Sequence, residues 1–183
     1  MREAEAIQRG RMRLVLIGIF FALPFALGWL VYAFQWTPGS TGNHGELLKP
    51  QRLSGKAFEA LKGKWIFVSF DRAACARACE EKLYYMRQVR TAQGKERERV
   101  ARLWILVDDG ALRPDLLRAI EGTQIARLDE AGPAAQFPTG PDRANYVYLV
   151  DPIGNLMMRY PLGADPAGMI KDMARLLRYS SFG

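Results

Sequence analysis

The sequence predicts an α/β protein: a mixed sheet flanked by helices, with one N-terminal transmembrane helix. Three observations carry this prediction. The chain begins with a long uncharged apolar run, strand-like and helix-like segments then alternate, and two adjacent strands joined by a tight turn precede a final helix. Alternation followed by an antiparallel pair is typical of a mixed sheet covered by helices. Because the whole chain has 183 residues, the part after the apolar run is one domain.

The first element is the apolar run from Leu14 to Phe34, which contains no charged residue. As a helix, a run of this length rises about 30 Å, the thickness of the hydrocarbon core of a bilayer. Pro24 is better tolerated in a membrane helix than in a soluble one. Trp36 and the aromatic residues near it mark an interface. We therefore predict a transmembrane helix over 14–36, in contact with the lipid bilayer through Leu14 to Phe34.

The orientation follows from the charges on either side of this helix. Four arginines precede it, and no basic residue follows it until Lys49. The positive-inside rule places residues 1–13 in the cytoplasm and everything after Trp36 outside. We expect a single-pass protein of a bacterial inner membrane with a periplasmic C-terminal domain. The alternatives are a cleaved signal peptide, for which the run is long, and a buried soluble helix, for which it lacks a polar face.

Composition excludes several classes of site. The formal net charge is +7, and it falls to +5 once residues 1–13, with four basic and two acidic groups, are set aside. The basic residues are spread along the chain, so we expect no nucleic-acid partner. One histidine excludes a two-histidine zinc motif, and two cysteines exclude a four-thiolate zinc site.

The first part of the remaining chain holds a linker, a strand and a helix. Residues 37–52 are rich in glycine, proline, serine and threonine, which predicts a linker or an extended arm before a folded domain over 53–183. The bulky run WIFVSF, 65–70, is typical of a buried central strand. A helix over 76–92 follows, with an apolar stripe at helical spacing, and it is closed by Gly94.

The alternation then continues through a helical stretch, a strand, a short helix and another strand. We predict them over 96–101, 103–108, 115–122 and 123–128.

A hairpin and a helix complete the domain. Segments 146–150 and 156–160 are strands joined by the turn sequence DPIGN. The last helix begins after Asp165, a good N-cap, with Pro166 in its first position, and ends near Tyr179.

Cys75 and Cys79 lie between the first strand and the helix after it. Residues four apart on a helix have Cβ atoms about 5–6 Å apart, whereas a disulfide brings them to about 3.8 Å, so a bond requires local unwinding. A helix N-terminus stabilises a thiolate and makes the thiol reactive. A disulfide between residues this close in the sequence reduces the entropy of the unfolded chain only slightly, so it adds little stability. The pair therefore favours a redox or metal-related role; the alternative is an inert disulfide or two packed thiols.

The chain resembles the SCO/SenC family of thioredoxin-like, membrane-anchored proteins that assist copper-site assembly in cytochrome c oxidase. The resemblance rests on the anchor, on GKWIFVSF followed by C-x-x-x-C, and on YLVDPIGNLMMRY before a closing helix. It implies a thioredoxin-like fold for 53–183 and copper binding through Cys75 and Cys79. It also implies cytochrome c oxidase subunits or assembly factors as partners.

Two departures separate this chain from the family pattern. Family members add a distal histidine to the copper ligands, but the corresponding stretch, PDRANYVYLVDP, has Arg143 at that position. Glu80 replaces the proline that commonly follows the second cysteine. His44, the only imidazole, lies in the predicted linker and is expected to be solvated rather than a ligand. Met157 and Met158 are expected to pack in their strand.

We therefore predict Cys75, Cys79 and Arg143 as the functional residues. Two thiolates can hold Cu(I), a soft ion, whereas a guanidinium near them favours the thiolate and disfavours cation binding. The alternative for Arg143 is an exposed loop residue.

Three functions are consistent with these residues. The first is an accessory protein for oxidase copper-site assembly that acts by thiol–disulfide exchange, with Cys75 attacking, or as a scaffold. The second is a non-catalytic accessory subunit bound to a complex of the respiratory chain. The third is a Cu(I) chaperone that uses Cys75, Cys79 and a non-standard third ligand.

Overall fold

The computed structural model describes residues 2–34, 42–129, 132, 136–138 and 140–180, and it divides into the units 1–41 and 42–183. The first unit is helix α1, Arg2–Ala33. Its segment Arg11–Ala33 is 23 residues long and apolar enough to cross a membrane, a property that a signal sequence shares. The predicted candidate transmembrane helix is thus present. Two predicted segments lie outside the described residues: the end of this helix, 35–36, and the first part of the linker, 37–41.

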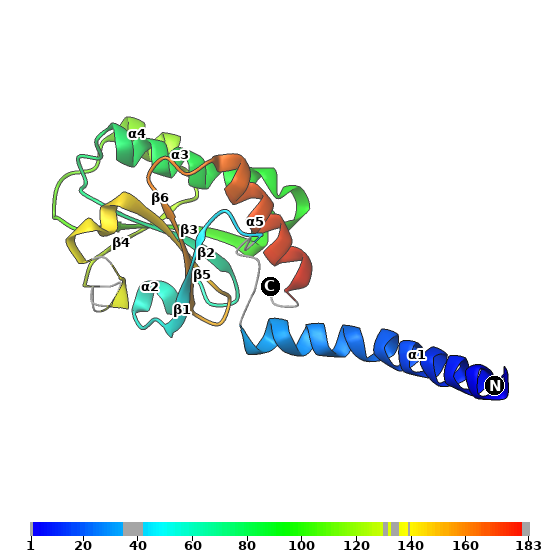
Figure 1. The fold of residues 1–183 in the computed structure, drawn as a ribbon. Helices are drawn as coiled ribbons and strands as arrows, with labels where there is room; N and C mark the ends of the chain where they lie inside the picture. Colours follow the sequence, from blue (N-terminus) through cyan, green and yellow to red (C-terminus); the bar gives the residue numbers. More distant parts are fainter. Residues whose placement is uncertain (1, 35–41, 130–131, 133–135, 139, 181–183) are drawn as a thin grey trace. The chain divides into compact units, whose positions relative to one another are not determined.

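The second unit is built on a mixed six-stranded sheet with the order β1-β6-β5-β2-β3-β4 (Figure 1). β2, β3 and β4 are mutually parallel, and β5, β6 and β1 are added to them in antiparallel pairs. The strands are β1 Glu46–Arg52, β2 Trp65–Asp71, β3 Val100–Leu106, β4 Gln124–Arg127, β5 Tyr146–Val150 and β6 Asn155–Pro161. The helices are α2 Lys56–Glu59, α3 Arg77–Ala92, α4 Pro114–Ala119 and α5 Pro166–Tyr179, with 3₁₀ turns η1 Gly94–Arg99 and η3 Gly140–Asn145.

The sheet has an apolar core on each face. Along β2, Trp65 and Phe67 belong to the core that includes side chains of α3, α4 and α5. Ile66 and Val68 belong to the opposite core, which includes α2. Figure 1 shows α3, α4 and α5 on one side of the sheet. Because successive side chains of a strand point to opposite faces, a strand covered on both sides must be apolar throughout, which confirms the prediction for WIFVSF.

The prediction of a linker is wrong for residues 46–52, which form β1. Glu46 pairs with Arg159 and Gln51 with Leu156 of β6, and the register is irregular between Leu47 and Gln51, where Pro50 lies. Proline has no N–H for a ladder, so it is tolerated on an edge strand with an irregularity. An edge strand is bonded on one side only, which allows the polar, mostly exposed sequence ELLKPQR.

His44 is exposed, as expected, and it is also hydrogen-bonded to the last helix. The backbone N–H groups of His44 and Gly45 donate to Oδ2 of Asp172 at 2.8 and 3.0 Å, and the His44 ring Nδ1 lies 3.1 Å from Oδ1. The Tyr160 hydroxyl also donates to Oδ2, at 3.2 Å. Burial and the Asp172 charge raise the pKa of Tyr160. This Asp172 cluster, formed by His44, Gly45, Tyr160 and Asp172, attaches the start of β1 to α5.

Most of the remaining predicted elements are present, with shifted ends. The helical stretch ends at Arg99, so β3 begins at Val100, earlier than predicted. Met158 is buried and Met157 packs against the core, as predicted. The prediction for the last helix is confirmed, because the Asp165 carboxylate accepts a hydrogen bond from the N–H of Ala167 at 3.0 Å as its N-cap.

Candidate functional site

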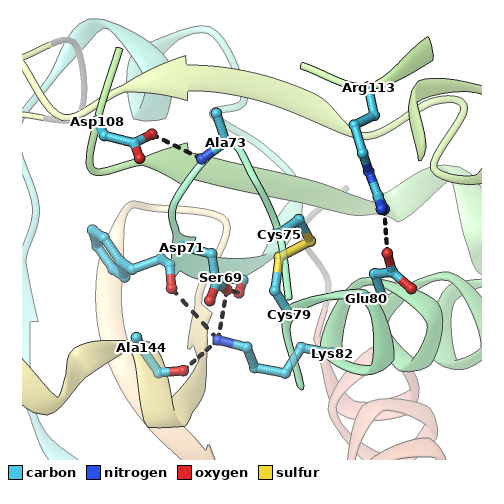
Figure 2. The surroundings of a disulfide bond; sticks show 11 residues. Ser69, Asp71, Ala73, Cys75, Cys79, Glu80, Lys82, Asp108, Arg113 and Ala144 are labelled. Atoms are coloured by element: carbon cyan, nitrogen blue, oxygen red, sulfur yellow. Dashed lines mark hydrogen bonds and ion pairs between the residues drawn. A yellow bond between two sulfur atoms is a disulfide. The ribbon is translucent and has the colours of Figure 1, made fainter. Parts of the chain in front are cut away.

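The site begins at the carboxyl end of β2, where the chain turns into α3. The N–H of Cys75 donates to the carbonyl of Arg72 at 3.0 Å, which closes the turn. The N–H of Ala73 donates to Oδ1 of Asp108, just after β3, at 2.8 Å (Figure 2). Cys75 has φ of 42°, and among the described residues it alone has a positive φ without being a glycine. Such a backbone costs about 1 kcal/mol or more and must be held by its surroundings.

Cys75 and Cys79 form a disulfide with a Cα–Cα separation of 5.2 Å. The predicted unwinding is present, because α3 begins only at Arg77 and Cys75 lies before it in the left-handed conformation. Cys79 lies in the first turn of α3, where the helix N-terminus favours a thiolate once the bond is reduced. Both cysteines are only 2% exposed.

A cleft of about 580 Å³ adjoins the disulfide on the Cys75 side. Part of its lining is apolar: Ala74, Ala76, Val107 and Leu128. The polar part consists of Asp71, Arg72 and Arg143, with Cys75 and Ala144 completing the wall. We call this the disulfide cleft. Within the described residues, Cys75 is the member of the disulfide that lines this cleft.

A buried ion pair lies behind this cleft. Nζ of Lys82, from α3, lies 2.7 Å from Oδ2 of Asp71 and 3.5 Å from the carbonyl of Phe70, and it also contacts the carbonyl of Ala144 (Figure 2). The Ser69 hydroxyl donates to the same Asp71 oxygen at 3.0 Å. Lys82 is 3% exposed, so its charge depends on these oxygens for stabilisation.

Burial dominates the titration of this pair. It raises the pKa of Asp71 above its usual value, against the pull of Lys82. It lowers the pKa of Lys82, against the pull of Asp71. Both shifts disfavour the charged forms. Asp71 lines the same cleft as Cys75.

Arg143 lines the same cleft as Cys75, as the sequence-based hypothesis requires. Its Nε donates to the carbonyl of Gly140 at 2.6 Å, and its guanidinium carbon lies 5.7 Å from the centre of the Phe70 ring. The side chain is half-buried, so it differs from a freely solvated loop arginine. Its influence on the thiols stays a prediction.

Glu80, at the position of the family's proline, forms an ion pair with Arg113, the residue before α4 (Figure 2). This pair links the first turn of α3 to α4, next to the disulfide. Its two charges offset each other at the surface.

The donor set for copper is incomplete. Among the residues that the structure describes, no three His, Cys, Asp or Glu side chains gather as a metal ion would need. The only histidine of the sequence belongs to the Asp172 cluster, and Arg143 lines the same cleft as Cys75. Two thiolates alone remain after reduction, so the residues present do not fit the three-ligand copper site that the resemblance implies.

Sequence reasoning missed Asp71, Lys82 and Asp108. An acidic residue at the carboxyl end of a buried strand, as Asp71 is, or two residues beyond it, as Asp108 is, was an available signal, because the carboxyl ends of parallel strands meet at one sheet edge. Lys82 gave no such signal, since a lysine in EEKLYYM is typical of a solvated helix face.

A disulfide where the central strand of a mixed sheet meets its helix defines this protein as a thioredoxin-like domain. Residues 65–180 match the family described as transmembrane-like, thioredoxin-like, C-terminal domain. The chain belongs to this family. No curated protein matches it in sequence.

Solved structures confirm the resemblance to SCO proteins at the level of the fold. Yeast Sco1 with copper bound has a TM-score of 0.54 and 16% identity, over 72% of this chain and 92% of that one. Arabidopsis thaliana ScoI with copper bound has a TM-score of 0.53 and 15% identity, over 72% of this chain and 98% of that one. Apo Sco1 from Thermus thermophilus has a TM-score of 0.51 and 16% identity, over 74% of this chain and 95% of that one.

Proposed function

We propose that this protein is a membrane-anchored accessory factor for the copper site of cytochrome c oxidase that exchanges disulfides with its partner. The observation that carries the proposal is a disulfide lining a cleft that a buried carboxylate also lines, without a third metal ligand among the described residues. The oxidase assignment is supported by the fold shared with SCO proteins. The location, a bacterial inner membrane with the domain on the periplasmic side, is supported by α1 and by the charges before it.

The exchange starts from the dithiol form. The Cys75 thiolate attacks one sulfur of a disulfide on the partner, and the other partner sulfur leaves as a thiolate that takes up a proton. Cys79 then loses its proton to the solvent and attacks the Cys75 sulfur, and the second partner sulfur leaves as a thiolate that takes up a proton. The partner gains two electrons and two protons, and Cys75–Cys79 returns to the disulfide. A dithiol reductant is needed to regenerate the starting form.

The test uses the full chain, reduced and held in a non-ionic detergent, with a disulfide-bonded peptide as substrate. We expect reduction of the peptide with one protein disulfide formed per peptide, abolished by Cys75→Ser. Cys79→Ser should stop at a mixed disulfide that mass spectrometry detects. A wild-type rate no higher than that of a free monothiol, together with no trapped species, would contradict the proposal.

The oxidase assignment has its own test. Cys79→Ser expressed in the native organism should retain the protein to which Cys75 becomes bonded, and we expect a copper-binding oxidase subunit or an assembly factor of that subunit. Cys75→Ser/Cys79→Ser is the matched control and should retain none. If Cys75 becomes bonded only to proteins unrelated to the oxidase, the role in oxidase assembly is contradicted, whereas the disulfide-exchange reaction is not.

A non-catalytic accessory subunit is the second candidate, because both cysteines are only 2% exposed. For that function, Cys75→Ser/Cys79→Ser should still co-purify with the respiratory complex and support its full activity. Full activity would favour this candidate over exchange.

Anaerobic titration of the reduced protein with Cu(I) tests the chaperone hypothesis. We expect no tight stoichiometric binding, since the third ligand is missing. One tight equivalent lost in Cys75→Ser/Cys79→Ser would favour a chaperone.

A further inference from the structure

The disulfide cleft carries a charge that the exchange reaction does not use. Its lining includes two arginines, Arg72 and Arg143, which come from separate parts of the chain and share the cleft with Cys75. Arg72 is exposed and is the residue whose carbonyl closes the hydrogen-bonded turn to Cys75. A turn of this kind holds the two Cα atoms within about 7 Å of each other. The backbone of Arg72 therefore lies close to that of Cys75, and both residues line the cleft.

Neither arginine is neutralised within the described part of the chain. The ion pairs found there do not include Arg72 or Arg143. Arg143 donates to a backbone carbonyl and lies over the Phe70 ring, and neither group carries a negative charge. Asp142, the neighbour of Arg143, is exposed but does not line the cleft.

Three acidic groups near the cleft are already engaged. Asp71 is paired with Lys82 at 2.7 Å. Asp108 accepts from the N–H of Ala73, and Asp109 is paired with Arg127. The unpaired charges in the lining of the cleft are thus those of the two arginines, whose field is positive, above walls that include Val107 and Leu128. A low-dielectric wall strengthens such a field.

We propose that the disulfide cleft selects a partner segment with acidic residues next to its disulfide and an apolar residue to contact Val107 and Leu128, with Arg72 and Arg143 as the residues that determine this preference. The inference rests on the proposed exchange function and adds the substrate class to it. A basic segment around the disulfide is repelled by the same two cations.

Three disulfide-bonded peptides test this preference, identical except that the residues flanking the disulfide are aspartate, serine or lysine. Their rates of reduction are measured with the reduced full chain in a non-ionic detergent at low and at high salt. At low salt we expect the aspartate peptide to react roughly tenfold faster than the lysine peptide. At about 0.5 M salt the ratio should approach one, because exposed charges are then screened.

Arg72→Gln/Arg143→Gln should bring the ratio at low salt close to one, and Arg72→Gln alone should reduce it part of the way. The matched control is Lys171→Gln/Arg178→Gln, which removes the same charge from exposed positions on α5. The control should keep the ratio. The inference is overturned if the aspartate and lysine peptides react equally, or if Arg72→Gln/Arg143→Gln keeps the preference. Failure to reduce any of the three peptides would instead remove the exchange function itself.

Discussion

Lys82 and Arg102 are both cations that are 3% exposed, one in α3 and one in β3, and their surroundings differ. Lys82 lies against the Asp71 carboxylate and two backbone carbonyls. Arg102 donates from Nη2 to the carbonyl of Glu121 at 2.6 Å, while its Nε and Nη1 are buried without a hydrogen-bond partner in the part of the chain that the structure describes. Burial, followed by the charges of Arg90 and Arg87, lowers the pKa of Arg102 to about 10.

The two cations lie toward opposite ends of the parallel strands. Asp71, the partner of Lys82, is opposite Leu106 at the carboxyl end of β2 and β3, whereas Arg102 is opposite Phe67, earlier in both strands. Lys82, the charge with a counter-charge, is paired with a residue that lines the disulfide cleft, whereas Arg102 is not among the lining residues. A buried cation therefore does not indicate a functional site by itself. A buried cation whose carboxylate partner lies beside a reactive group does.

The largest expected effect is at Lys82. Lys82→Met should lower the free energy of unfolding by about 3 kcal/mol or more, because it leaves the Asp71 carboxylate buried without its cation. Denaturant titration at neutral pH measures this. Lys82→Met/Asp71→Leu removes both charges and should regain most of the loss. If the double variant is as unstable as the single one, the loss comes from packing instead of charge.

Arg102 should respond in the opposite direction. Arg102→Met should raise the free energy of unfolding by about 1–2 kcal/mol, because it removes a buried charge that lacks a carboxylate partner. Arg97→Met, at an exposed position, is the control and should change the stability by less than about 0.5 kcal/mol. A destabilised Arg102→Met would mean that Arg102 is better satisfied than its hydrogen bonds indicate.

The pH dependence of stability tests the Asp71 side of the comparison. The folded protein holds the Asp71 proton more tightly than the unfolded chain, whose pKa is near 3.8. The stability that this group contributes is fully present below that value and is lost as the pH rises through the raised pKa of the folded state. The slope is at most about 1.4 kcal/mol per pH unit. Wild type relative to Asp71→Asn should therefore become less stable as the pH rises from 4; the opposite slope would mean that Lys82 outweighs burial.

The smallest effect concerns the turn at the carboxyl end. Asp108→Ala should lower the free energy of unfolding by about 1 kcal/mol, because the N–H of Ala73 loses its acceptor. It should also speed the reaction of the disulfide with a small reductant, since the turn that holds Cys75 is loosened. Asp109→Ala, which removes an exposed ion pair, should do neither. Equal reductant rates in both variants would show that Asp108 does not hold the turn.

Elements whose side chains are buried could be predicted from the sequence, because burial leaves an apolar pattern. WIFVSF predicted the central strand because a strand covered on both faces must be apolar, and the strand–cysteine–helix order located the disulfide. β1 was missed because an edge strand needs neither apolar residues nor freedom from proline. Lys82 and His44 were missed for a shared reason: each is stabilised by a single carboxylate distant in the sequence, or on another element, that no local pattern indicates.

The Asp172 cluster has a practical consequence for making a soluble version of the domain. A chain cut just before Glu46 would keep every strand but leave the Asp172 carboxylate inside with the Tyr160 hydroxyl as the sole remaining donor of the cluster. A cut at Gly42 preserves all of these contacts. Two expression plasmids that differ by only four codons should thus yield proteins of clearly different heat resistance.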